Sequence, residues 1–180
     1  RSYIAGFGVL TAAVAAGGDG SGGVAVTSTE EFGGTSWTTG GVLNVARRNA
    51  VGTGTSTAGL AVGNYSSGDE VEEWNGTGWT VATVIPTGKY GIFGGMGTQT
   101  DCMLAGGGNP TRIAVCNTYD GTNWATSPSM ATARLGGGSA GTSSSAFATG
   151  GQSGSTVGST TTENFNGETS AANIVTVTTS

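Results

Sequence analysis

The sequence predicts an all-β fold built from four successive repeats, and three observations support this prediction. A pair of turn-forming residues recurs about every 45 residues, at Gly17-Gly18, Gly63-Asn64, Gly106-Gly107 and Gly150-Gly151. An aromatic residue follows each pair with a similar period, at Phe32, Trp74, Tyr119 and Phe165. The chain also contains 36 glycines and no window with apolar residues at helical spacing, which disfavours helices. A period in the forties is typical of repeat arrays and propeller blades.

A basic residue opens each repeat, at Arg1, Arg48, Lys89 and Arg134. Division at this residue gives four modules, 1–47, 48–88, 89–133 and 134–180, which we interpret as the blades of one domain. Four blades can close into a ring, or they can form part of a larger propeller, because propellers contain roughly four to eight blades.

Each module is expected to contain four short strands. The second strand ends at the turn pair and alternates bulky with small residues, as in Ala13-Val14-Ala15, which suits a strand packed between two sheets. The third strand is acidic and aromatic, as in Glu72-Glu73-Trp74, and a hairpin turn such as Asn75-Gly76 follows it. The fourth strand begins at Trp37, Trp79 or Trp124, whereas Thr169-Ser170 occupies this position in the last module.

The two cysteines, Cys102 and Cys116, fall on the second and third strands of one module. A turn centred on Asn109-Pro110 would place them opposite each other, at a separation that a disulfide tolerates. The alternative is a pair of small buried thiols. A metal site is disfavoured, because two cysteines without histidine make a poor set of ligands.

No catalytic, cofactor-binding or metal-ligating constellation is present in the sequence. The absence of histidine removes the commonest general base and most transition-metal sites. Glycosidases use a unique local pair of carboxylates, whereas the carboxylates here recur once per module. We therefore predict a non-enzymatic protein without a cofactor. The recurring charges are expected to form structural ion pairs or backbone hydrogen bonds; they are Glu30, Glu72 and Glu163 together with Arg1, Arg48, Lys89 and Arg134.

The charge and hydropathy of the chain exclude several partners. A formal net charge of −5 disfavours binding to nucleic acid or to anionic membranes. No stretch approaches the roughly 20 apolar residues of a membrane-spanning helix. The apolar run that follows Arg1 aligns with the same element in the other modules, which favours a strand over a signal peptide.

The modules resemble kelch-type propeller blades, in which a basic residue, a strand ending in Gly-Gly, an acidic and aromatic strand and a tryptophan follow in order. The segments 30–37 (EEFGGTSW) and 72–79 (EEWNGTGW) are similar to the Gly/Thr/Ser-rich kelch-like repeats of virion and tail-fibre proteins from marine tailed phages. This resemblance covers all 180 residues. It implies a β-propeller located in a virion or outside a cell, and it is more specific for fold than for function, because propellers serve many purposes.

We expect a virion structural or attachment module, of the tail-fibre, appendage or capsid-decoration type, that contacts a host-surface glycan or protein. Its partners would be other virion proteins or further copies of itself. Recognition is expected on the unequal hairpin loops, because loops on a rigid scaffold commonly bind ligands; these loops are Asp19–Val24, Tyr65–Gly68, Asn109–Arg112 and Gln152–Ser159. A secreted or cell-surface adhesion propeller is the alternative, and a carbohydrate-active enzyme is a remote one.

Overall fold

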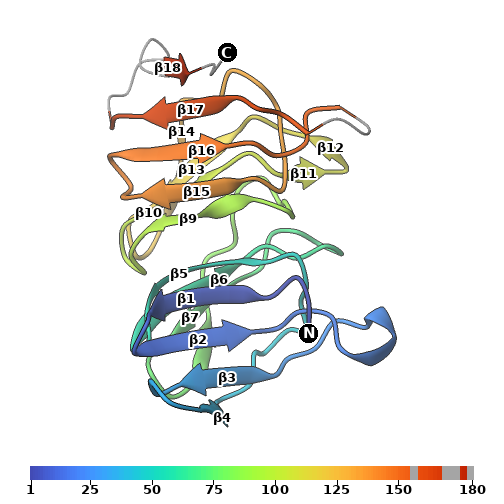
Figure 1. Cartoon of the computed structure of the whole chain (residues 1–180), viewed down its shortest axis with the longest axis vertical. Helices are drawn as coiled ribbons and strands as arrows, with labels where there is room; N and C mark the ends of the chain where they lie inside the picture. The colour runs from blue at the N-terminus through green and yellow to red at the C-terminus, as the bar shows by residue number, and fades with distance from the viewer. Residues whose placement is uncertain (155–157, 168–174, 178–180) are drawn as a thin grey trace.

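A computed structural model describes residues 1–154, 158–167 and 175–177, and it shows a four-bladed β-propeller without any α-helix in these ranges (Figure 1). Each blade is an antiparallel sheet of four strands. The predicted all-β propeller of four four-stranded blades is therefore confirmed. The position of Thr169-Ser170 and residues 155–157 of the last predicted loop lie outside the described ranges.

The strands follow one another in each blade in chain order. Blade 1 contains β1 (Ala5–Val9), β2 (Ala12–Ala16), β3 (Thr29–Phe32) and β4 (Trp37–Thr39), and blade 2 contains β5 (Val51–Thr55), β6 (Ala58–Val62), β7 (Val71–Trp74) and β8 (Trp79–Val81). Blade 3 contains β9 (Phe93–Gly97), β10 (Cys102–Ala105), β13 (Cys116–Tyr119) and β14 (Trp124–Ser127), with a small hairpin of β11 (Gly108–Asn109) and β12 (Thr111–Arg112) between β10 and β13. Blade 4 contains β15 (Gly138–Gly141), β16 (Ala146–Thr149), β17 (Thr162–Phe165) and β18 (Val175–Val177).

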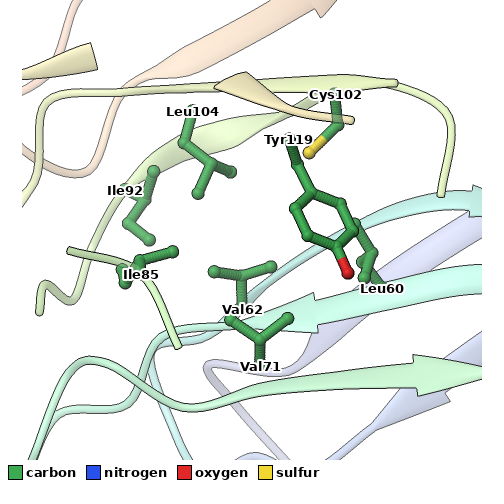
Figure 2. Close-up of a cluster of buried hydrophobic side chains, with 8 residues drawn as sticks. All are labelled: Leu60, Val62, Val71, Ile85, Ile92, Cys102, Leu104 and Tyr119. Carbon is green, nitrogen blue, oxygen red and sulfur yellow. The ribbon is translucent and has the colours of Figure 1, made fainter. Parts of the chain in front are cut away.

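The core lies between successive blades, because the second strand of each blade has apolar residues on both faces. Leu60 of β6 and Leu104 of β10 belong to one buried cluster between blades 2 and 3, where side chains from the two blades point toward each other (Figure 2). A cluster that includes Val14 and Ala61 joins blades 1 and 2, and one that includes Met103 and Ala148 joins blades 3 and 4. Alternating bulky and small residues thus fit sheets that pack face to face.

Glycines allow the inner strands of neighbouring blades to approach closely. The inner strands pack in the order β1 with β5, β5 with β9, and β9 with β15. The Phe93 ring of β9 is fully buried against Gly137, where an added β-carbon would overlap the ring and would lie 2.5 Å from the carbonyl oxygen of Thr149. Any side chain at this position must displace a packed ring or the backbone.

Replacement of Gly137 by alanine is expected to lower the free energy of unfolding by about 1–3 kcal/mol, the usual cost of overpacking. Urea denaturation measures this loss. Gly78 is the matched control, because an added β-carbon there meets no atom within 4 Å, and Gly78→Ala should stay within about 0.5 kcal/mol of the wild type. Equal effects of the two substitutions would show that the contact between Phe93 and Gly137 does not limit the packing of blades 3 and 4.

The prediction that Cys102 and Cys116 lie opposite each other is wrong. Cys102 is paired with Tyr119 and Cys116 with Ala105, and both cysteines are free and buried. The predicted turn assumed one continuous hairpin, whereas Gly106 and Gly107 interrupt the ladder before the small hairpin at Asn109 and Thr111. An odd shift of register moves side chains to opposite faces, so Cys102 packs toward blade 2 and Cys116 toward blade 4.

Candidate functional site

In blades 1, 2 and 4 the recurring basic residue forms an ion pair inside the blade, but Arg47 rather than Arg48 occupies this position in blade 2. The Arg47 guanidinium donates to the Glu72 carboxylate, and both side chains are completely buried. Arg134 and Glu163 form the same pair at 2.8 Å in blade 4. Arg1 and Glu30 pair at 2.7 Å in blade 1, where both groups are partly exposed. Arg48 instead pairs with Asp19 of blade 1 at 3.2 Å.

These pairs fasten the chain where it enters a blade. The Arg47 guanidinium also donates to the carbonyl oxygens of Ala61 and Glu70, each at 3.2 Å. The Glu72 carboxylate accepts hydrogen bonds from the backbone amides of Asn44 and Val45 at 2.8 and 3.1 Å. A buried charge is stable only when its hydrogen-bonding capacity is filled, and here both partners are bonded. The pair is therefore a structural clamp, and neither group is available to a ligand.

Blade 3 departs from this pattern because it has no carboxylate beside its basic residue. Lys89 is fully buried, and its ammonium group donates to the carbonyl oxygen of Val115 at 3.1 Å. Asn117, on β13, stands where the other blades have glutamate, and its side-chain amide has no hydrogen-bond partner among the described residues. Desolvation by burial consequently lowers the pKa of Lys89 to about 8.

The thiols of the two cysteines in blade 3 are expected to react slowly. Burial raises the pKa of the Cys102 thiol to about 12, and burial also raises the pKa of Cys116. Because the thiolate is the reactive form, neither side chain is suited to nucleophilic chemistry.

Native protein at pH 8 is therefore expected to react with a thiol-specific reagent such as Ellman's reagent at less than about one hundredth of the rate of the urea-unfolded chain. Absorbance of the released chromophore measures the rate. Unfolded chain should release two equivalents, since Cys102 and Cys116 are both free. Rapid release of one equivalent from native protein would contradict the burial of these thiols.

A central hollow of about 610 Å³ is the largest concave feature described, and all four blades line it. Three backbone hydrogen bonds run around its rim between equivalent positions: Asn49 donates to Tyr3 at 3.0 Å, Gly91 to Asn49 at 3.2 Å, and Gly136 to Gly91 at 2.7 Å. These four residues have φ between 54° and 70°. The left-handed conformation turns the chain into each inner strand. The backbone conformation and backbone hydrogen bonds therefore determine the shape of the rim.

An aromatic and basic surface continues outward from this rim. Tyr90 lines the hollow, and its ring lies 4.9 Å from that of Tyr65. The Arg48 guanidinium stacks 4.7 Å from the centre of the Tyr65 ring and pairs with Asp19. Tyr3, also on the rim, is mostly exposed. We call this surface, made of Tyr3, Asp19, Arg48, Tyr65 and Tyr90, the recognition face.

The recognition face combines flat apolar ring surfaces with polar groups that can form hydrogen bonds to a ligand. The tyrosine rings offer apolar surface with a polar hydroxyl, and a guanidinium offers several donors in a fixed plane. Two of the predicted loops, Asp19–Val24 and Tyr65–Gly68, contribute to this face. The third loop lies beside it, because Tyr90 Oη donates to the carbonyl oxygen of Pro110. Arg112 Nε of that loop donates to the carbonyl oxygen of Gln152, the first residue of the fourth predicted loop.

Sequence reasoning did not predict that Arg48 and Tyr90 belong to this surface. Both residues stand out in the sequence when the four modules are aligned on Arg1, Arg47, Lys89 and Arg134. The residue after the clamp base is Ser2 in blade 1, Arg48 in blade 2, Tyr90 in blade 3 and Leu135 in blade 4. A position that differs in every blade is not required by the repeat, so it is free to serve recognition.

The described ranges contain no cluster of three or more Cys, Asp or Glu side chains that could hold a metal ion, and the chain has no histidine. In the same part of the chain, no helix has the length and apolar character needed to cross a bilayer. No protein-family model matches the chain, and a sequence search of curated proteins also found no match.

Proposed function

We propose that this protein is a non-enzymatic attachment module of a virion, which binds surface glycans of a host through the recognition face. The observation that carries this proposal is the grouping of Tyr3, Tyr65 and Tyr90 with Arg48 beside a hollow of about 610 Å³. Small-molecule sites commonly have volumes of roughly 300–1,000 Å³ and a few well-placed polar groups. The virion assignment rests on the resemblance of segments 30–37 and 72–79 to phage kelch-like repeats.

A saccharide suits these groups better than the other ligand classes. Sugar rings have apolar faces that can stack on tyrosine, and their hydroxyl groups can accept from the guanidinium or donate to the Asp19 carboxylate. A nucleic acid is disfavoured by the net charge of −5. The Glu72 and Glu163 carboxylates are buried and each is bonded to an arginine, so they are unlike the free carboxylate pair that glycoside hydrolysis requires.

A glycan microarray probed with the labelled protein tests the binding proposal. The wild type should bind a subset of glycans, and Tyr65→Ala should weaken that binding by about tenfold or more, as expected for an aromatic residue in the centre of a binding surface. Val81→Ala is the control, because Val81 is exposed on the outer strand β8 of the same blade. Absence of binding to every glycan, or equal binding by Tyr65→Ala, would contradict the proposal.

The virion location is tested separately. Mass spectrometry of purified virions that carry this sequence should detect its peptides at a stoichiometry of many copies per particle. Detection only in the host cell or the medium would instead support an adhesion propeller.

A further inference from the structure

The three interfaces between blades use the same two faces each time. We call the face that carries Val14, Leu60, Met103 or Phe147 the forward face, because the first three of these residues pack toward the next blade. We call the opposite face, toward the preceding blade, the rear face. On this face Trp79 Nε1 donates to Thr29 Oγ1 of blade 1 at 2.9 Å. Trp124 Nε1 donates at 2.9 Å to the carbonyl oxygen of Thr83, which lies in the segment between blades 2 and 3.

Nothing in the described structure covers the rear face of blade 1 in this way. Trp37 is 52% exposed, whereas its equivalent Trp79 is 8% exposed. The Trp37 ring contacts the Phe32 ring of its own blade, and its indole N–H has no hydrogen-bond partner within the described ranges. The Glu30 carboxylate is half exposed, whereas the equivalent glutamates of blades 2 and 4 are buried. A hollow of about 200 Å³ lies among these groups, lined by Arg1, Ile4, Ala15, Glu30 and Trp37.

Among the residues that the structure describes, none covers the forward face of blade 4 either. Phe147 is 41% exposed, whereas Val14, Leu60 and Met103 at the equivalent position are at most 3% exposed. The inner strands β15 and β1 do not pack together as the other successive inner strands do. The described part of the chain therefore presents one unpaired forward face and one unpaired rear face, which are the two halves of an interface that it forms three times internally.

We propose that the forward face of blade 4 in one copy of this chain docks on the rear face of blade 1 in a second copy. The contact would repeat the internal interfaces. Phe147 of one copy would pack against Ala15 of the second copy, and Trp37 of the second copy would pack on blade 4 of the first. Since the two faces differ, the contact is head to tail, and such contacts produce closed rings or extended filaments. Self-assembly of this kind does not depend on the proposed glycan binding.

Sedimentation velocity over a range of concentrations tests this inference. At high concentration the wild-type 180-residue chain should have a mass of at least twice the 17.5 kDa of one chain. Phe147→Arg and Trp37→Arg should each remain monomeric, because each removes one half of the contact. An equimolar mixture of the two variants should form dimers and nothing larger, because Phe147→Arg retains the rear face and Trp37→Arg retains the forward face. Val81→Arg, on the outer strand of blade 2, should assemble like the wild type.

Circular dichroism confirms that each variant is folded, and Ile4→Arg replaces Trp37→Arg if that variant is not. A wild type that stays monomeric at every concentration would overturn the inference. Assembly that persists in both single variants, or the absence of dimers in their mixture, would overturn it too.

Discussion

Replacement of Arg47 by alanine is expected to lower the free energy of unfolding by about 3–5 kcal/mol, the usual cost of breaking a buried ion pair from one side. The substitution leaves the Glu72 carboxylate fully buried without its counter-charge. It also removes the donors to the carbonyl oxygens of Ala61 and Glu70. Urea denaturation monitored by tryptophan fluorescence gives this free energy.

The adjacent residue supplies a matched control for this prediction. Arg48 has the same side chain, but it is partly exposed and pairs with Asp19 near the protein surface. Exposed pairs contribute at most about 1 kcal/mol, so Arg48→Ala should have a small effect on stability. Similar losses from the two substitutions would contradict the assignment of the clamp to Arg47.

Replacement of Lys89 by methionine is expected to change how stability depends on pH. Burial lowers the pKa of Lys89 to about 8 in the folded protein, whereas the ordinary pKa of a lysine is 10.5. The folded state therefore disfavours the charged form, and this penalty is complete below pH 8. It disappears as the pH rises toward 10.5, where the unfolded chain also loses the proton. The stability advantage of Lys89→Met over the wild type should thus shrink by about 3 kcal/mol between pH 7.5 and 10.5.

The difference between the two proteins is the informative quantity. Cys102, Cys116 and Tyr119 have raised pKa values, and they make both proteins less stable as the pH rises through the range where these groups ionise in the unfolded chain. The contributions of Cys102 and Tyr119 are shared and cancel, whereas that of Cys116 cancels only in part, because the charges of Lys89 and Cys116 interact. Urea denaturation at pH 7.5, 9 and 10.5 gives the three differences, and a constant difference would show that the pKa of Lys89 is not lowered by burial.

The fold was predictable because its determinants are local and repeated. Alternation with a period of two identifies strands such as β2, and Asn75-Gly76 marks the turn between β7 and β8. Repetition of these signals four times also identified the propeller, since one period relates all the blades.

The register of individual residues was not predictable in the same way. Arg47 and Arg48 are adjacent, and only the position of Glu72 in the folded blade determines which one becomes buried. Cys102 likewise pairs with Tyr119 in the register that the other blades share, as Ala13 pairs with Phe32 in blade 1, and the turn assumed at Asn109-Pro110 did not reproduce this register. Such details arise from tertiary packing, which overrides local patterns.

The candidate site was predictable only in outline. Two of the predicted loops do contribute to the recognition face, but the contact between the Tyr65 and Tyr90 rings joins residues from blades 2 and 3. No sequence spacing links these residues, because the contact depends on how blades 2 and 3 are arranged around the hollow.

The central claim is that residues repeated once per blade maintain the fold, whereas the residues of the recognition face, which differ between blades, are not needed for it. The free energy of unfolding of Arg134→Ala and Tyr65→Ala, measured side by side in urea, tests this claim most directly. Arg134 is buried in its clamp and Tyr65 is half exposed, so we expect a loss of about 3–5 kcal/mol for the first and about 1 kcal/mol or less for the second. An undiminished stability of Arg134→Ala, or an equally large loss in Tyr65→Ala, would contradict it.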